Sequence, residues 1–266
     1  MRPLPGLDAA RLRGILFDID DTLTTHGKLT SEAYAAMQRA KCAGLMLVPI
    51  TGRPAGWCDH IARMWPVDGV VGENGAFYMA HDESSHRLIS RYVKDEATRR
   101  ADREIIDRVA HEILEAVPGS ALASDQAYRA ADIAIDFCED VAPLPNEAVL
   151  RIQSIMATHG LNAKISSIHV NGWLGGYDKL STTRLFLRER FAIDLDATKD
   201  EFVFIGDSPN DAPMFAFFPM SVGVANVRIH ADSMPALPAF VTRNECGAGF
   251  VELVDAVLAS AVRPSR

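Results

Sequence analysis

The chain has 266 residues, of which 48% are hydrophobic and 23% are charged, and its 35 acidic and 27 basic side chains give a net charge of −8. This composition is typical of a globular protein and excludes a disordered or fibrous chain, while the negative charge offers no basic footprint for a nucleic-acid partner. No apolar run reaches the length of a membrane span, and residues 1–14 lack the apolar stretch of a secretion signal, so we expect no membrane association and a cytoplasmic location.

The cysteines support this expected location. Cys42, Cys58, Cys138 and Cys246 are far apart in the sequence, and none belongs to a CxxC pair or a cysteine–histidine cluster. This spacing argues against a disulfide scaffold and against a structural zinc site, and it predicts four reduced thiols.

Residues 1–81 show the alternation of strands and helices that is typical of a parallel sheet. Short apolar runs over 13–18, 45–50 and 69–71 have the character of buried parallel strands. We expect one helix to begin with Ser31 as its N-cap and another to cover about 56–64. Such strand–helix–strand units are joined by right-handed crossovers within one parallel sheet.

The pattern changes near residue 82, where a charge-rich stretch begins. The elements expected after it are helices over 104–116 and 146–158 and strands over 132–137, 162–166 and 168–174. The three strands alternate between polar and apolar residues, which predicts that each has one exposed face. Residues 82–176 are therefore expected to form a small inserted α+β domain with an open, mostly antiparallel sheet.

The first pattern returns at Tyr177. The elements expected here are a helix over 180–191, strands over 201–205, 220–223 and 240–242, and a closing helix over 249–261. The predicted fold class is therefore α/β, with a Rossmann-like parallel-sheet core formed by residues 1–81 and 177–266 and interrupted by the inserted domain.

Three of the core strands end in polar clusters. These clusters are Asp18-Ile19-Asp20-Asp21-Thr22, Thr51-Gly52-Arg53 and Gly206-Asp207-Ser208-Pro209-Asn210-Asp211. Because ligands of open α/β sheets bind at the carboxyl ends of the strands, we expect the three clusters to meet. Five carboxylates at one edge need a counter-charge, and a hard divalent cation such as Mg²⁺ supplies it.

Two other interpretations of the first cluster are weaker. A helix cap or a solvated turn explains one aspartate, but not two carboxylates side by side with a second acidic cluster elsewhere. An EF-hand loop requires a glycine where Leu23 stands, and it would follow a helix rather than a strand.

The order of these motifs resembles that of the haloacid dehalogenase superfamily phosphatases, in the Cof-type subfamily IIB, whose large cap follows the second motif. The matching motifs are Asp18 to Leu23, Thr51 to Arg53, Lys179, and Gly206 to Asp211. Asp21 stands where many relatives have glycine. Relatives with this cap type include phosphatases of sucrose-phosphate and of mannosyl-3-phosphoglycerate, and the resemblance covers nearly the whole chain.

The resemblance implies a role for each motif residue. Asp18 would attack phosphorus and form an aspartyl-phosphate, and Asp20 would protonate the leaving alcohol and then activate water. Mg²⁺ would bind Asp18, Asp207 and the backbone carbonyl of Asp20, and Asp211 would act through water or by orienting Lys179. The resemblance also implies that Thr51 and Lys179 bind the phosphate.

Gly52, Arg53, Asn74 and Asn210 are further candidates for substrate binding. Arg53 has three open alternatives: it contacts the substrate, contacts a carboxylate of the inserted domain, or pairs with Asp59.

The inserted domain is expected to select the substrate. His169, Asn171 and Trp173 share one face of the strand over 168–174, because successive side chains of a strand point to opposite faces. We hypothesise that this face forms a roof over the active site, with a sugar ring covering Trp173. The alternative is a solvated outer face.

The sequence thus predicts a Mg²⁺-dependent phosphatase of small phosphorylated metabolites, with sugar or polyol phosphates as the substrate class. A phosphomutase of the same superfamily and a non-catalytic binding protein on this fold remain as alternatives. A dehalogenase is disfavoured, because Asp20 has a function only when an alkoxide leaves. The expected partner is the small-molecule substrate, and the oligomeric state stays open.

Overall fold

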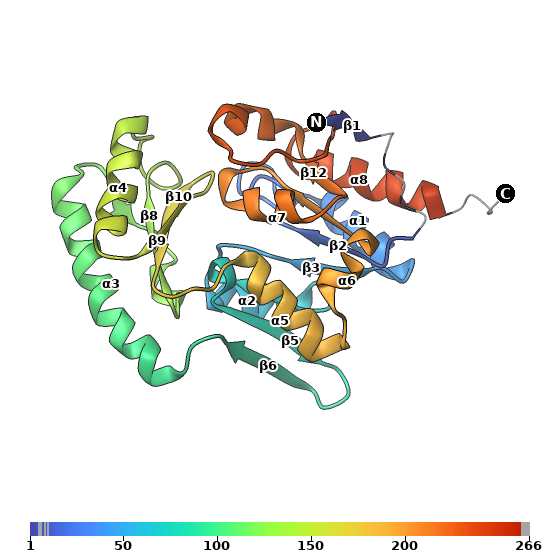
Figure 1. Cartoon of the computed structure of the whole chain (residues 1–266), viewed down its shortest axis with the longest axis horizontal. Helices are drawn as coiled ribbons and strands as arrows, with labels where there is room; N and C mark the ends of the chain where they lie inside the picture. The colour runs from blue at the N-terminus through green and yellow to red at the C-terminus, as the bar shows by residue number, and fades with distance from the viewer. Residues whose placement is uncertain (5–6, 8, 10, 262–266) are drawn as a thin grey trace.

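The computed structural model describes residues 1–261 except 5, 6, 8 and 10, so the last five residues of the predicted second core segment lie outside the described residues. Figure 1 shows two lobes, a larger one that holds both ends of the chain and a smaller one that holds α3, α4 and β8 to β10. The predicted α/β core with an inserted α+β domain is confirmed.

The core sheet has six strands, all paired in parallel. Their order across the sheet is β1 (Arg2–Pro3), β13 (Phe240–Val241), β12 (Ser221–Gly223), β11 (Phe202–Gly206), β2 (Gly14–Phe17) and β3 (Met46–Pro49). The central strands β2 and β11 are buried along their whole length, as expected for parallel strands covered on both faces.

Helices cover the two faces of this sheet. On one face α1 (Ser31–Cys42) and α8 (Cys246–Ala261) pack against one set of strand side chains, and on the other α5 (Lys179–Phe191) and α7 (Ala212–Phe217) pack against the alternate set. The N-cap of α1 is Thr30, whose hydroxyl accepts from the backbone N–H of Ala33, so the predicted cap at Ser31 is one residue late. The short helix α6 (Leu195–Thr198) leads into β11.

A second sheet of three strands was only partly predicted. The strands β4 (Val70–Gly72), β5 (Phe77–Asp82) and β6 (Arg87–Tyr92) pair antiparallel, with α2 (Ala55–Met64) packed against them. The predicted boundary at residue 82 falls inside the β5–β6 hairpin, whose polar β6 residues have the composition of a charged linker. We propose that the inserted domain begins near residue 93 instead.

The inserted domain has the predicted antiparallel sheet. Its strands lie in the order β7 (Ala121–Leu122), β8 (Asp132–Asp136), β10 (His169–Trp173) and β9 (Asn162–Ile165), covered by α3 (Glu96–Ala116) and α4 (Asn146–Thr158). The bounds of α4 are those expected. The expectation of half-exposed strands was wrong for β8 and β10, since every residue of both is buried. Their apolar face packs on α3 and α4, and their polar face lies against the core.

Trp173 also departs from the expectation. Its side chain is only 3% exposed, stacks on Tyr177 and donates its Nε1–H to the Tyr177 carbonyl at 3.1 Å. The ring packs with Ile19 and Phe77 of the core, and Trp173 also lines a cavity of about 220 Å³ together with Asn74, Lys179 and Asn210. The contact of Trp173 with a sugar ring stays a prediction. Burial of a large aromatic side chain at the seam between the two lobes explains why it occupies the last position of β10.

No helix of the described chain is long and apolar enough to cross a membrane. All four cysteines are free, as predicted.

One prediction concerns Gly75, which follows the turn at Glu73 and Asn74 and lies against the start of α5. Its φ is +109°, and a Cβ placed there would lie 2.1 Å from the Asp178 carbonyl oxygen. We expect Gly75→Ala to lower the free energy of unfolding by about 1–3 kcal/mol, because alanine resists this backbone conformation and has no room. Thermal denaturation measures the loss. Gly176→Ala is the matched control, since no atom lies within 4 Å of its Cβ position; equal melting temperatures for the two variants would contradict the prediction.

Candidate active site

The three polar clusters meet at one edge of the core sheet, as the sequence predicted. Asp18 follows β2, Thr51 follows β3 and Asp207 follows β11, and β2 lies between the other two strands. Parallel pairing brings the carboxyl ends of the three strands side by side, so residues distant in the sequence come into contact.

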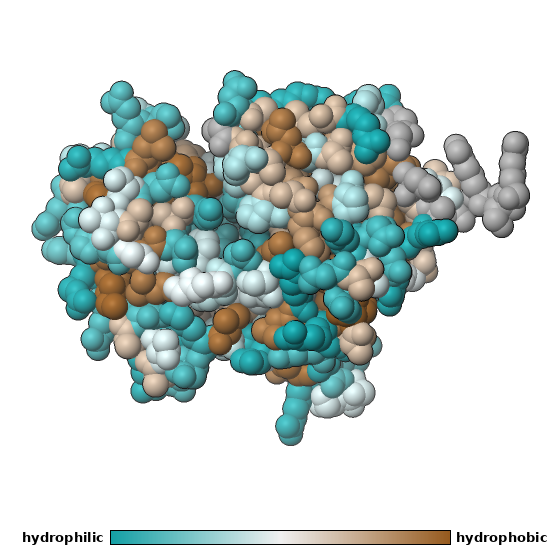
Figure 2. Space-filling model, in the orientation of Figure 1, coloured by the Kyte–Doolittle hydropathy of each residue, from teal (hydrophilic) through white to brown (hydrophobic). Residues whose placement is uncertain are grey.

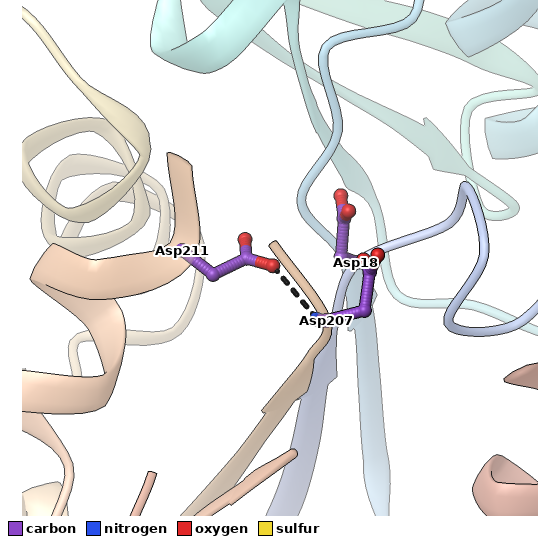
Figure 3. A group of neighbouring side chains, drawn as sticks. All are labelled: Asp18, Asp207 and Asp211. Carbon is purple, nitrogen blue, oxygen red and sulfur yellow. Dashed lines mark hydrogen bonds between the residues drawn. The ribbon is translucent and has the colours of Figure 1, made fainter. Parts of the chain in front are cut away.

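The centre of the site is a buried group of three carboxylates. Oxygen atoms of Asp18, Asp207 and Asp211 lie within 4.8 Å of one another, and Figure 3 shows the side chains converging from different segments. Asp211 accepts from the backbone N–H of Asp207 at 3.1 Å, and Asp207 accepts from the Thr22 hydroxyl at 3.0 Å. These contacts fix the carboxylates before any ligand binds.

Lys179 is the cation closest to this group. Its ammonium donates to Oδ1 of Asp18 at 2.9 Å and to Oδ1 of Asp211 at 2.7 Å. Lys179 opens α5, whose first turn is capped by the Asp178 carboxylate, so the helix start aims the lysine into the site. Burial disfavours the charge of Lys179, but Asp18 and Asp211 outweigh it and hold its pKa above the ordinary value.

The site carries more negative charge than one lysine balances. Burial raises the pKa of Asp18 to about 7 against the attraction of Lys179, and burial together with Asp18 and Asp211 raises the pKa of Asp207 well above its usual range. Three carboxylates with one ammonium are a donor set that suits a hard divalent cation. The residues present therefore fit a divalent metal, with Asp18, Asp207 and Asp211 able to hold it.

The side chain of Asp20 lies outside this group of three and pairs with Arg53 instead. The Arg53 Nε lies 3.0 Å from both Asp20 oxygens, and Nη2 donates to Oδ1 at 2.8 Å. Arg53 also reaches two carboxylates of the inserted domain, Glu139 at 2.8 Å and Asp125 at 3.3 Å. Of its three alternatives, the contact with carboxylates of the inserted domain is the one found.

The alternative pairing of Arg53 with Asp59 was wrong. Asp59 pairs with Arg63 one helical turn away on the surface of α2. The Arg53 guanidinium lies instead over the Trp57 ring, 4.4 Å from its centroid.

The Thr51 loop is held by the turn that follows β4. The backbone N–H of Asn74 donates to the Thr51 carbonyl at 3.0 Å, and the Thr51 hydroxyl accepts from the Arg53 N–H at 3.0 Å. Asn74 has a left-handed backbone with φ of 53°, and its buried Nδ2 has no hydrogen-bond partner in the structure. This amide lies beside Gly52, where it forms an unused donor next to the loop predicted to bind phosphate.

The polar face of β10 lies over these loops. His169 and Asn171 line a small cavity that also contacts Asp18, Asp20, Gly52 and Asn210. The cavity measures about 10 Å³, which is room for roughly one water molecule. A phosphorylated metabolite does not fit this space, although a second cavity of about 220 Å³ is lined by Asn74, Trp173, Lys179 and Asn210. A substrate that contacts His169 and Asn171 therefore requires the inserted domain to move away from the core.

Several buried charges at this seam were missed by the sequence analysis. Arg129 donates to Asp125 at 3.1 Å, to Asp132 at 3.0 Å and to the Gly52 carbonyl at 2.9 Å. The alternation of residues 132–137 puts Asp132 on the polar face of its strand, as it does His169 on the strand over 168–174. This alternation is the signal in the sequence that could have pointed to Asp132. Nothing local distinguishes Arg129 from a surface arginine.

Comparisons with known proteins show what this chain is similar to. A model of haloacid dehalogenase-like hydrolases matches residues 15–115. A phosphoglycolate phosphatase from Pyrobaculum neutrophilum is 27% identical over 249 residues, which is 92% of this chain and 95% of that protein.

Solved structures share the fold. A Thermoplasma acidophilum protein matches with a TM-score of 0.68 at 18% identity, covering 93% of this chain and 98% of that one. The sucrose-phosphatase from Synechocystis matches with a TM-score of 0.62 at 14% identity, covering 92% of this chain and 98% of its own.

The fold and the matched segment together define the class of this protein. Residues 15–115 contain both the Asp18 and the Thr51 motifs, and the site lies between a parallel-sheet core and an inserted cap, so the chain is an enzyme of the hydrolase class. Over this segment it is similar to the haloacid dehalogenase-like hydrolases, in agreement with the resemblance that the order of its motifs indicated.

We predict that a divalent metal stabilises the folded protein through the three carboxylates. Saturating Mg²⁺ should raise the melting temperature, since a ligand at 100 times its Kd adds about 2.7 kcal/mol to the free energy of unfolding. Asp207→Asn should remove the shift, and Asp59→Asn on the surface should retain it. Melting temperatures that do not respond to Mg²⁺, or a shift that survives in Asp207→Asn, would exclude this metal site.

Proposed function

We propose that this enzyme is a Mg²⁺-dependent phosphatase that hydrolyses small phosphorylated metabolites, with sugar or polyol phosphates as its substrate class. The observation that carries the proposal is the contact of Lys179 with both Asp18 and Asp211 beside Asp207, under the cap. This arrangement provides a carboxylate nucleophile together with the positive charge that an anionic phosphate requires.

Asp18 is the proposed nucleophile. Its carboxylate attacks phosphorus in line, the bond to the leaving oxygen breaks, and a covalent aspartyl-phosphate results. Lys179 holds one oxygen of Asp18 at 2.9 Å and so orients the carboxylate while offsetting its repulsion from the phosphate. A bound Mg²⁺ supplies further positive charge for the phosphoryl oxygens.

Asp20 is the proposed general acid and base. It gives a proton to the leaving alkoxide and then takes one from the water that hydrolyses the aspartyl-phosphate, which releases inorganic phosphate and restores Asp18. Both oxygens of Asp20 contact Arg53 in the closed arrangement. A substrate must therefore displace part of this contact, and Arg53 is left with its partners in the cap.

Thr51, Gly52, Asn74 and Asn210 are proposed to bind the phosphoryl group or the atoms next to it. The unpartnered Nδ2 of Asn74 supports this role, since a buried amide without an acceptor costs free energy until a ligand supplies one. Asp211 is proposed to position Lys179, which its carboxylate contacts at 2.7 Å.

The charge of the roof favours a neutral leaving group. Around the cavity, the two guanidinium groups of Arg53 and Arg129 contact four carboxylates, those of Asp20, Asp125, Asp132 and Glu139. His169 lies 2.9 Å from Glu139 and can add at most one positive charge. A substrate with a carboxylate in addition to its phosphate would meet this excess of negative charge. The hydroxyl groups of a sugar, in contrast, could donate to the carboxylates and accept from Asn171.

This argument separates two substrate classes suggested by the related proteins. The relative from Pyrobaculum is named for phosphoglycolate, whose leaving group carries a carboxylate, and the Synechocystis neighbour is named for a sugar phosphate. The roof of this chain is closer in charge to what a sugar requires.

The nucleophile assignment predicts the behaviour of Asp18→Asn. We expect kcat to fall by about 10³-fold or more, because the amide cannot form the covalent intermediate. Asparagine retains an oxygen that can accept from Lys179, so circular dichroism should show an intact fold. Asp59→Asn serves as control, and substantial phosphate release by Asp18→Asn would contradict the mechanism.

The same assay of the unmodified enzyme tests the phosphomutase alternative. Detection of an isomerised sugar phosphate without phosphate release would favour that alternative.

The charge argument predicts the substrate profile. With Mg²⁺ present, kcat/KM for the best hexose, pentose or polyol phosphate should exceed that for phosphoglycolate by about tenfold or more. Glu139→Gln should lower the ratio of sugar phosphate to phosphoglycolate kcat/KM, because it removes one negative charge from the roof. Glu147→Gln, at an exposed position of α4, should leave this ratio unchanged. A preference for phosphoglycolate in the unmodified enzyme would overturn the proposed substrate class.

A further inference from the structure

Glu73 is a buried carboxylate that the proposed chemistry does not use. Its side chain has no exposed surface, and its backbone has a φ of 44°, which is uncommon for a residue other than glycine. The next residue, Asn74, also has a positive φ, of 53°. Burying a charge in an unfavourable turn is costly, so the surrounding structure must compensate for it.

Backbone N–H groups from both lobes supply that compensation. One oxygen of Glu73 accepts from Ala55 at 3.0 Å and from Ala130 at 2.8 Å. The other oxygen accepts from Ala131 at 2.7 Å and from Asp132 at 3.2 Å. Ala55 begins α2 in the core, whereas residues 130–132 lead into β8 of the cap, so one carboxylate joins the two lobes.

Arg129 makes the reciprocal connection from the cap to the core. Its Nη1 donates to the backbone carbonyl of Gly52 at 2.9 Å while Asp125 and Asp132 hold the guanidinium in place. The carboxylate of Glu73 in the core thus accepts from backbone N–H groups of the cap, and the guanidinium of Arg129 in the cap donates to a backbone carbonyl of the core. Burial and the charge of Asp132 raise the pKa of Glu73 to about 7, and Arg129 and the N–H donors oppose that rise.

These contacts lie between the two halves of the proposed substrate site. The backbone N–H of Glu73 donates to the Arg53 carbonyl at 3.1 Å, which ties the turn to the Thr51 loop. Residues 132–136 form β8, which pairs directly with the β10 strand that carries His169 and Asn171. Glu73 therefore connects the Thr51 loop, which is proposed to bind phosphate, with the strands β8 and β10 that lie over this loop.

We propose that Glu73 is a positioning residue that latches the cap over the active site through the backbone N–H groups of residues 130–132. The part of this inference that concerns turnover rests on the proposed phosphatase function. Because the cavity at His169 and Asn171 is too small for a substrate, a substrate that contacts these residues requires the cap to open and close again, and the Glu73 contacts favour the closed state. Closure matters most for a substrate whose leaving group needs the roof and a proton from Asp20.

The first test is amide hydrogen exchange of the whole protein. Glu73→Gln preserves the shape of the side chain but turns an NH₂ group toward N–H donors that need an acceptor. The backbone amides of residues 130–132 should exchange about tenfold faster in this variant than in the unmodified enzyme. Unchanged exchange there would overturn the latch. This readout does not depend on any enzymatic activity.

The second test compares two substrates. For the best sugar phosphate, kcat/KM of Glu73→Gln should fall by about 10–100-fold. For p-nitrophenyl phosphate, whose leaving group needs no proton from Asp20, the fall should be about threefold or less. Equal falls for the two substrates would show a general structural defect and would overturn the positioning role. Glu189→Gln is the matched control, since Glu189 lies near the end of α5 and accepts from Tyr78 of the core rather than from a cap residue.

A third variant covers the case in which Glu73→Gln does not fold. Arg129→Lys retains the positive charge beside Asp125 and Asp132 but lacks the planar fork that reaches Gly52. It should produce the same faster exchange at residues 130–132 and the same selective loss of sugar phosphate turnover, and the absence of both would overturn the proposal. If the unmodified enzyme hydrolyses neither substrate, the proposed function fails while the exchange experiment still decides the latch.

Discussion

The burial of three carboxylates at the end of a parallel sheet is the constraint on which the rest of this structure depends. Asp18, Asp207 and Asp211 lie in the protein interior with one ammonium group, Lys179, in direct contact. Such a cluster is unfavourable by itself, because each charge loses its hydration. It persists because backbone and side-chain donors are fixed around it, and because its donor set can take up a cation.

The same principle extends to the seam between core and cap. Figure 2 shows hydrophilic residues over much of the visible surface, yet the charges most important to the architecture lie inside, between the lobes. Arg53 contacts two carboxylates of the cap. Arg129 and Glu73 each form hydrogen bonds with backbone groups of the opposite lobe. Polar contacts of this kind depend on geometry and can exchange for contacts with a ligand. Trp173 and Tyr177 make a large apolar contribution at the seam.

The local patterns that were predicted well are those in which a short segment carries its own signal. The bounds of α4 followed from its residue pattern, the buried strands β2 and β11 followed from short apolar runs, and the presence of β8, β9 and β10 in an antiparallel sheet followed from alternation. The β5–β6 hairpin was missed because its second strand mixes polar and apolar residues on both faces, so that neither alternation nor an apolar run marks it. Trp173 was assigned to the correct face, but its burial was missed, because alternation identifies the face of a strand and not what packs against that face.

The sequence by itself determined that Asp18, Thr51 and Asp207 meet, because parallel strands bring their carboxyl ends to one edge and each residue lies within two positions of the end of its strand. It also indicated the resemblance to the haloacid dehalogenase-like hydrolases, since the order of the motifs is a property of the chain. Only the tertiary structure decided that Asp20 pairs with Arg53, that Arg129 reaches Gly52 and that Glu73 binds residues 130–132. These contacts join segments from separate lobes, and their partners are largely backbone groups that every residue possesses. Nothing in the identity of Gly52 or Ala131 marks them as partners of a buried charge, so such contacts are fixed by how the two lobes pack together.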